Sequence, residues 1–423
     1  MIYCINYKRS NQTFSVETSL STLFFREETM KKLLIAVLCL MLTGCAAPAP
    51  SDGSGPDRSV SPDIPAPSPA ASSAPNGESG PPQASPETDP ETAENPSASQ
   101  EPSESSLGPQ NQEQIIQELL SAMTLEEKVG QMFFVRCPET GGAELAAQYK
   151  VGGYLLFGRD FKDKTAQQVR DDIQSYQDAS GIPLLIGTDE EGGTVVRASS
   201  NPDLFPQREP APQTLFAQGG MDLILQDARQ KSMTLLDLGV NVNFAPVADV
   251  STDPADFIYA RSFGQDAQAT ANYVAQVVGV MGEEQIGSVL KHFPGYGNNV
   301  DTHTGIALDQ RPYETFQTSD FLPFQAGIQA GADAVLVSHN IAASMDESLP
   351  ASLSPAVHDL LRDELAFDGV VMTDDLAMDA VMEYAQNGSA AVLAIQAGND
   401  MVVTTDFQTQ IPQVIHAVQS GVI

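Results

Sequence analysis

The segment that follows the apolar run 288–290 carries residues that could do acid–base chemistry. Lys291 and His292 come directly after this run, which is typical of a short buried strand, and Asp301 and His303 follow in a loop broken by glycines. Loops positioned by a rigid strand often carry catalytic groups. Histidine titrates near neutral pH, and a neighbouring carboxylate can fix its tautomer and raise its proton affinity, as a general acid/base requires. Alone, an Asp-x-His triplet is more often part of the solvated surface. Whether this one is catalytic therefore depends on the strands and helices that position it.

Eight short apolar runs predict the strands that would hold these groups. Between most of them lie stretches of helical periodicity, for example 223–238, 269–284 and 355–365. This alternation predicts a parallel sheet covered by helices, and eight units in about 300 residues match a TIM-type (β/α)8 barrel. A doubly wound open sheet is the alternative, but the first run lacks the Gly-rich phosphate loop typical of that fold. The runs are 129–135, 153–157, 183–188, 240–250, 288–293, 334–338, 369–373 and 401–404.

A barrel places its functional side chains at the carboxyl ends of several strands. Three of the five histidines, His292, His303 and His339, follow predicted strands, whereas His358 and His416 fall in predicted helices. A histidine-rich metal site is disfavoured because no two histidines are spaced to share one helix face, so neither metal nor cofactor is predicted. We therefore expect one polar pocket built from five strand ends. They carry Asp189–Gly193, Asp249, Lys291–His292, His339–Asn340 and Asp374–Asp375.

Residues 30–45 are typical of a secretory leader. Met30–Lys32 is basic, and the ten apolar residues that follow are too few to span a bilayer as a helix. The leader ends in Leu42–Cys45, which resembles the bacterial lipobox, in which the cysteine becomes the lipidated first residue. Cys45 is therefore the predicted lipidation site, and residues 1–29 are expected to be an over-extended start.

Residues 46–110 predict a disordered tether. The segment holds about half of the chain's 29 prolines and no aromatic residue, so it cannot bury enough apolar surface to offset its ordering entropy. The folded domain is expected to span 111–423. Once the leader is removed and Cys45 is lipidated, Cys137 is the remaining cysteine, so no disulfide framework is predicted.

The net charge of −34 argues against nucleic-acid binding, because phosphate contacts need clustered lysine and arginine. Acidity of this size favours solubility in an extracytoplasmic space. We expect a lipid anchor on the bacterial membrane to be the protein's contact with the bilayer.

Five separated motifs resemble glycoside hydrolase family 3, and within it the β-N-acetylhexosaminidase branch. The match runs from about residue 115 to the C-terminus and implies a retaining mechanism with two displacements. The motifs are Asp189–Gly193, Arg261–Gly264, Lys291–Gly295, Asp301–His303 and Thr373–Met378.

The resemblance assigns three residues to the chemistry. Asp374 would be the nucleophile that attacks the anomeric carbon, and Asp301 with His303 would be the acid/base dyad. Retention needs a nucleophile and an acid/base about 5 Å apart across the scissile bond. The adjacent Asp375 raises the alternative of a substrate acetamide acting as nucleophile. Strand alternation points the two carboxylates in different directions, which favours Asp374 and leaves Asp375 a structural role.

Asp189, Arg261, Lys291 and His292 would bind the hydroxyls and acetamide of the terminal sugar, as the resemblance implies. His339, at the end of the sixth predicted strand, is placed with them as a substrate-binding residue. Such groups, converging in a dry pocket, suit the recognition of ring hydroxyls.

The chain departs from the branch at three positions near these motifs. Tyr296 stands where a second histidine is usual, Glu190 where a glutamine is usual, and Thr194 where Gly-Arg is expected. None removes a predicted catalytic group, but together they leave the substrate open. The last predicted helix is also shorter than in relatives, so we expect either a fragment of a longer chain or a barrel with a short eighth helix.

We therefore predict a monomeric, surface-anchored β-N-acetylglucosaminidase that trims terminal N-acetylglucosamine (GlcNAc) from peptidoglycan or related glycans. One alternative is a phosphorylase, since a histidine acid/base does not repel incoming phosphate. Another is a β-glucosidase or xylosidase of the same family, although those branches do not use the Asp-x-His loop. A third is a non-catalytic lipoprotein that binds muropeptides.

Overall fold

The computed structural model describes residues 109–299, 301, 307–378, 381, 384 and 389–423. The predicted leader, the lipidation site Cys45 and nearly all of the predicted tether lie outside these residues. Within them, no helix is long and apolar enough to cross a bilayer.

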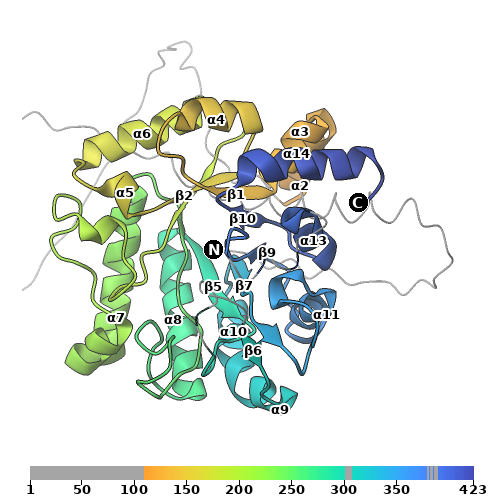
Figure 1. The fold of residues 1–423 in the computed structure, drawn as a ribbon. Helices are drawn as coiled ribbons and strands as arrows, with labels where there is room; N and C mark the ends of the chain where they lie inside the picture. The colour runs from red at the N-terminus through yellow and green to blue at the C-terminus, as the bar shows by residue number, and fades with distance from the viewer. Residues whose placement is uncertain (1–108, 300, 302–306, 379–380, 382–383, 385–388) are drawn as a thin grey trace, which may run out of the picture. The chain divides into compact units, whose positions relative to one another are not determined.

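Eight parallel strands follow one another around a barrel (Figure 1). The sheet order is β10-β1-β2-β3-β4-β5-β7-β9, and a parallel bridge between Met372 and Met401 joins its two ends. The prediction of a TIM-type barrel is confirmed, and the open doubly wound sheet is excluded because the outermost strands are neighbours. The strands are β1 Phe133–Arg136, β2 Gly153–Leu156, β3 Leu185–Thr188, β4 Val242–Asn243, β5 Gly287–Phe293, β7 Ala334–Val337, β9 Val370–Thr373 and β10 Val402–Thr404.

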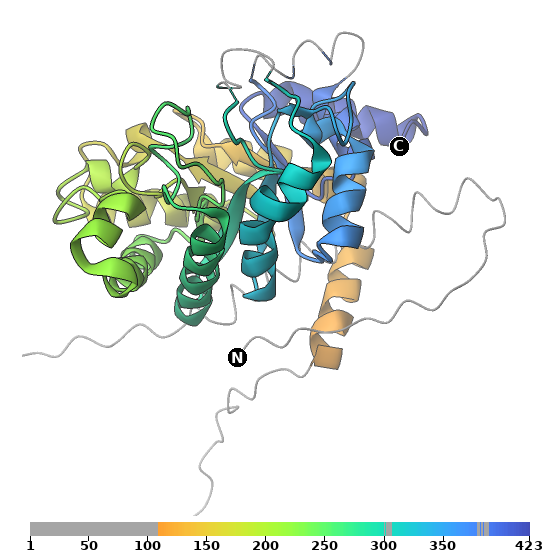
Figure 2. The same cartoon turned by 90° about the horizontal axis from the view of Figure 1, so that it is seen from below.

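Helices surround the strands, and α7, α8 and α10 stand side by side in Figure 2, in green to cyan. A small parallel pair, β6 Leu308–Asp309 and β8 Ile341–Ala342, lies outside the barrel sheet. The helices are α2 Pro109–Ala122, α3 Leu125–Gln131, α4 Gly142–Tyr149, α5 Gly158–Phe161, α6 Ala166–Asp178, α7 Pro212–Asp237, α8 Ala267–Glu284, α9 Tyr313–Thr315, α10 Phe321–Gln329, α11 Pro355–Asp359, α13 Ala390–Ala397 and α14 Phe407–Gln419. The described residues also form short 3-10 turns at Ala198–Ser200 and Ala351–Leu353, and π-helical turns at Phe316–Asp320 and Leu360–Glu364.

Predicted boundaries were wrong at several elements. The fourth apolar run, 240–250, is strand only at Val242–Asn243, which form β4. The first apolar run was expected to be strand from Val129, but its first three residues end helix α3. Thr124 starts that helix with a capping box: its hydroxyl accepts from the Glu127 amide, and the Glu127 carboxylate accepts from the Thr124 amide. Helix α7 begins eleven residues before the predicted start at 223, with a proline in its first turn. A kink at Gly220 divides it, so its second part begins close to the predicted residue.

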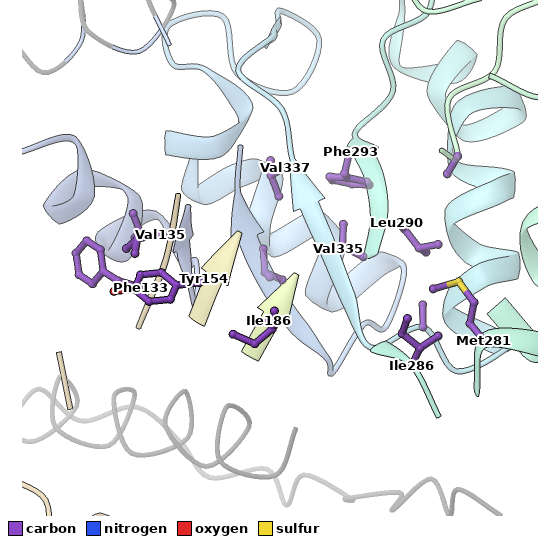
Figure 3. Close-up of a cluster of buried hydrophobic side chains, with 14 of the residues drawn as sticks. Phe133, Val135, Tyr154, Ile186, Met281, Ile286, Leu290, Phe293, Val335 and Val337 are labelled. Atoms are coloured by element: carbon purple, nitrogen blue, oxygen red, sulfur yellow. The ribbon is translucent and has the colours of Figure 1, made fainter. Parts of the chain in front are cut away.

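Buried side chains form two layers, one outside the strands and one inside the barrel. Along β1, Phe133 and Val135 face the helices, as Figure 3 shows, while Phe134 lies in the inner cluster. This is the two-residue alternation of a strand. Counting in steps of two residues from the inner-cluster side chain of each strand therefore identifies the side chains at the strand end that face the barrel axis.

Candidate active site

A ring of inward-facing side chains stands above the inner cluster at the carboxyl ends of five strands. Phe134, Leu155, Leu185, Val289 and Met372 belong to that cluster. Positions two or four residues further on have the same facing, because side chains alternate along a strand. Those positions are Arg136, Phe157, Asp189, Lys291 and Asp374.

Lys291 joins two of the strand ends through its buried ammonium group. Its Nζ lies 2.7 Å from Asp189 Oδ1 and 2.6 Å from Glu191 Oε1, and its side chain is 2% exposed. Asp189 and Lys291, both predicted as site residues, are thus in contact although 102 residues separate them. A buried ammonium group bound by two carboxylates is fixed in position, which suits the binding of sugar hydroxyls.

Glu191 connects this pair to Arg261. Arg261 donates from Nε to Glu191 Oε2 at 3.0 Å and from Nη2 to Oε1 at 2.8 Å. Burial alone would raise the pKa of Glu191, but the charges of Arg261 and Lys291 outweigh it and hold that pKa well below its ordinary value. The sequence offered one signal for Glu191, its place in the motif Asp189–Gly193, but we had assigned only Asp189 a role.

His292 is held between Arg261 and Asp249. Its Nδ1 lies 2.7 Å from Asp249 Oδ2, and its Nε2 lies 3.0 Å from Arg261 Nη2. An imidazole protonated on Nδ1 satisfies both bonds, with Nε2 as the acceptor. Asp249 also accepts from the backbone N–H of His292 and of Tyr296. Asp249 was expected in the pocket as a strand end but not as the residue that orients His292.

The adjacent carboxylates at the end of β9 have different surroundings. Asp374 is the inward one, and its Oδ1 accepts from the Asp375 N–H at 2.8 Å. The Asp375 carboxylate accepts from the hydroxyl and N–H of Thr405, at 2.7 and 3.1 Å, and from the Ala377 N–H at 2.9 Å. Asp375 therefore ties the end of β9 to the end of β10, while strand alternation from Met372 puts Asp374 on the inward side.

His339 is fully buried beside this turn. Its Nδ1 lies 2.7 Å from Ser352 Oγ, and its Nε2 lies 3.1 Å from the Asp375 carbonyl oxygen. The geometry favours a role in positioning the β9 turn over direct contact with a sugar.

The loop after β5 carries the predicted dyad. His303 lies outside the described residues, and Asp301 is half-buried. The described ends of the loop meet at Arg311, which donates from Nη1 to both oxygens of Asp320 at 3.0 Å, from Nη2 to Asp309 Oδ2 at 2.7 Å and to the Gly295 carbonyl at 3.2 Å. Asp309 and Asp320 are 2% and 1% exposed. One guanidinium thus fixes the two ends of the loop to each other.

No group of three or more potential metal ligands occurs in the part of the chain that the structure describes. The predicted absence of a metal and of a cofactor stays a prediction.

The model of the glycosyl hydrolase family 3 N-terminal domain matches residues 124–423. A β-hexosaminidase of Stenotrophomonas maltophilia (strain R551-3) is 35% identical over 291 residues, which cover 66% of this chain and 85% of that protein. A β-hexosaminidase of Nitrosomonas eutropha is 33% identical over 260 residues, covering 60% of this chain and 73% of that one.

Solved structures agree with these relatives. A family 3 β-N-acetylglucosaminidase from Paenibacillus sp. str. FPU-7 superposes with a TM-score of 0.65 at 30% identity, covering 71% of this chain and 59% of that one. A β-N-acetylhexosaminidase from Beutenbergia cavernae gives a TM-score of 0.62 at 29% identity, covering 70% of this chain and 93% of that one. The chain therefore spans most of the length of some relatives and about three fifths of the Paenibacillus enzyme.

Proposed function

Because this chain belongs to glycosyl hydrolase family 3, we propose that it is a retaining exo-β-N-acetylhexosaminidase that hydrolyses terminal GlcNAc residues. The family and the β-hexosaminidase relatives support a glycosidase. The observation that supports the finer proposal is the inward ring, in which strand alternation puts Asp374 at the same end of the barrel and on the same inward side as the buried network around Lys291. A carboxylate on a rigid strand end is the placement that a nucleophile needs.

In the proposed first step, the Asp374 carboxylate attacks the anomeric carbon as the glycosidic bond breaks. The leaving oxygen takes a proton from His303, which Asp301 orients. In the second step, His303 removes a proton from water, the water oxygen attacks the anomeric carbon, and Asp374 leaves as a free carboxylate. The configuration at the anomeric carbon is retained.

The network at the ends of β3, β4 and β5 would hold the terminal sugar. Asp189 offers an acceptor, and Lys291 and Arg261 offer donors, all fixed by ion pairs and hydrogen bonds before a sugar enters. His292 holds the Arg261 guanidinium in position through its Nε2. Groups fixed in advance lose little entropy on binding, which favours a pocket selective for one sugar.

We also propose that the protein is a monomer anchored outside the cytoplasm by a lipid on Cys45 and acts on peptidoglycan fragments. The leader sequence and the proline-rich tether of residues 46–110 support this proposal. Incorporation of labelled fatty acid by the full chain, and its loss in Cys45→Ala, would test the anchor.

The catalytic proposal is tested by release of 4-nitrophenol from its β-GlcNAc glycoside and its β-glucoside, with and without phosphate. The protein used would be residues 46–423. We expect preference for the GlcNAc glycoside and no acceleration by phosphate. Acceleration by phosphate would instead indicate a phosphorylase, and preference for the glucoside would indicate the glucosidase branch. Folded protein that releases no nitrophenol from either glycoside would indicate the muropeptide-binding lipoprotein.

A further inference from the structure

Two arginines at the pocket mouth stack on one phenylalanine. The guanidinium carbon of Arg136 lies 4.3 Å from the centre of the Phe157 ring, and that of Arg197 lies 4.9 Å from it. The two charges are therefore at most about 9 Å apart, by the sum of these distances. The ring holds both guanidinium groups in place, as cation–π contacts do.

These two guanidinium groups have N–H donors that are not used in hydrogen bonds to the described residues. Among the described residues, Arg136 has no hydrogen bond or ion pair from its side chain, and its buried Nε–H lacks an acceptor. The buried Nε–H of Arg197 also lacks one, and its ion pair to Asp189 is 3.4 Å long. Asp189 is already bound by Lys291 at 2.7 Å. Each guanidinium carries five N–H donors, so most of those on Arg136 and Arg197 remain available.

Both arginines border the pocket. Arg136 is the last residue of β1 and, by strand alternation, belongs to the inward ring with Asp189 and Asp374. In the barrel, β10, β1 and β2 lie between β9 and β3, so Arg136 at the end of β1 stands on the arc between Asp374 and Asp189. Both arginines are half-buried, so a bound glycan could reach them.

We propose that Arg136 and Arg197, stacked on Phe157, form a subsite for an anionic substituent of the glycan. The group bound would be a carboxylate, a sulfate or a phosphate, carried either by the terminal sugar or by the sugar that leaves. The proposal rests on the proposed glycosidase function and adds a preference for charged substrates.

Charge and geometry favour an anion over a neutral hydroxyl. The chain has 21 basic residues against 55 acidic ones, yet Arg136 has no acidic partner among the described residues and Arg197 has only the 3.4 Å pair with Asp189. The neighbouring Arg159, by contrast, is paired with Glu139 at 3.2 Å. A guanidinium fork matches the two oxygens of a carboxylate, sulfate or phosphate, and such charged hydrogen bonds are about twice as strong as neutral ones.

The test compares kcat/KM on matched neutral and anionic substrates for wild type and Arg136→Gln. One pair is the 4-nitrophenyl β-GlcNAc glycoside and its 6-sulfate, which places the anion on the terminal sugar. The other is chitobiose and a GlcNAc disaccharide with a carboxyalkyl ether at O3 of the reducing sugar, which places it on the leaving sugar. We expect wild type to prefer the anionic member of one pair, and Arg136→Gln to lose roughly 10- to 100-fold of that preference.

Arg136→Lys, which keeps the charge, should retain part of the preference. Arg170→Gln is the control, because Arg170 pairs with Asp237 on the outer surface, and it should leave the preference intact. The proposal would be overturned if wild type did not favour the anionic substrate in either pair. It would also be overturned if Arg136→Gln lowered kcat/KM equally on the neutral and the anionic substrate of a pair. Calorimetric binding of GlcNAc 6-sulfate and of GlcNAc keeps the test independent of turnover, so a protein without glycosidase activity would refute the proposed function but not the subsite.

Discussion

The two halves of the candidate active site are built by different means. The network around Lys291 sits on the ends of β3, β4 and β5 and joins residues far apart in the chain, 70 residues for Arg261 and Glu191 and 43 for His292 and Asp249. The loop that carries Asp301 is held at its ends by Arg311, whose partners are nearer in the chain: Asp309 two residues away, Asp320 nine and the Gly295 carbonyl sixteen. The backbone ladder of the barrel fixes the first half, and side-chain ion pairs fix the ends of the second.

This difference suggests that the two halves have different functions in the reaction. Groups that bind the sugar and attack it need fixed distances, which neighbouring strands provide. A group that gives and takes a proton serves two steps in turn, on the leaving oxygen and on water. Changes in the two halves should therefore affect different steps, and the following variants test that expectation from the largest effect to the smallest.

The largest effect is expected from the strand-borne nucleophile. Asp374→Ala should lower kcat by about 10⁴-fold or more on every substrate, because no glycosyl-enzyme can form. His303→Ala should slow release of 4-nitrophenol far less, since this leaving group needs little protonation. Steady-state kinetics on the 4-nitrophenyl β-GlcNAc glycoside would measure both. Equal losses in the two variants would contradict the division between strand and loop.

The second largest effect is expected from a substitution in the network around Lys291, as a loss of folding stability. Glu191→Gln leaves Arg261 and Lys291 without their shared counter-charge in a buried site, which typically costs about 3–5 kcal/mol of folding free energy. Urea unfolding would measure the loss. The loss should also grow from acid to neutral pH: the depressed pKa of Glu191 contributes stability above its unfolded value near 4.3, and that stability disappears as pH falls.

The control for that change is Glu284→Gln. Glu284, the last residue of α8, pairs at the surface with Arg229 of α7, and surface ion pairs contribute little to stability. A loss in Glu191→Gln no larger than in this control would mean that the network is not a stabilising unit.

The anchor of the loop should give a smaller effect with a distinct signature. Arg311→Gln leaves Asp309 and Asp320 buried without their cation, and we expect a loss of about 2–4 kcal/mol in stability. Its kcat should fall several-fold more on chitobiose than on the 4-nitrophenyl glycoside, because misplacing the acid matters most for a poor leaving group.

Arg362→Gln is a matched control for this variant. Arg362 also binds a buried carboxylate, Asp400, and also lies over a phenylalanine, Phe367, but it sits before β9 at the opposite end of the barrel. It should lose stability without a dependence on the leaving group. The same dependence in both variants would mean that Arg311 acts through stability alone.

Asp320 gives the anchor a pH dependence. Burial raises its pKa to about 6, despite the opposing charge of Arg311. A carboxyl group with a raised folded pKa contributes stability that is fully present below its unfolded pKa near 3.9 and is lost as pH rises through about 6. The unfolding free energy of wild type relative to Asp320→Asn should therefore fall by about 2 kcal/mol from pH 4 to pH 7. A difference that is flat or rises with pH would contradict this shift.

The sequence predicted the strand half of the site better than the loop half. Apolar runs located all eight strands, and Asp189 and Lys291 followed because strand ends meet in a barrel. Glu191 and Arg311 were not assigned roles because their function depends on partners that only the folded chain brings near. Arg136 was not assigned a role either, because a single basic residue after an apolar run is common and Phe157, on which it stacks, is far from it in the sequence. Val129 was misplaced because a capping signal at Thr124 outweighs a short apolar run.

The smallest effect is expected at Asp375, next to the proposed nucleophile. Its carboxylate is occupied by Thr405 and by the Ala377 N–H, so Asp375→Asn should keep part of this bonding and cost about 1 kcal/mol or less. The kcat on the 4-nitrophenyl β-GlcNAc glycoside should fall less than tenfold. If the substrate acetamide were the nucleophile, a second carboxylate would be needed to orient it, and Asp375 is the neighbouring candidate. A fall in Asp375→Asn as large as in Asp374→Ala would therefore favour the acetamide mechanism, because a residue that only ties β9 to β10 cannot account for it.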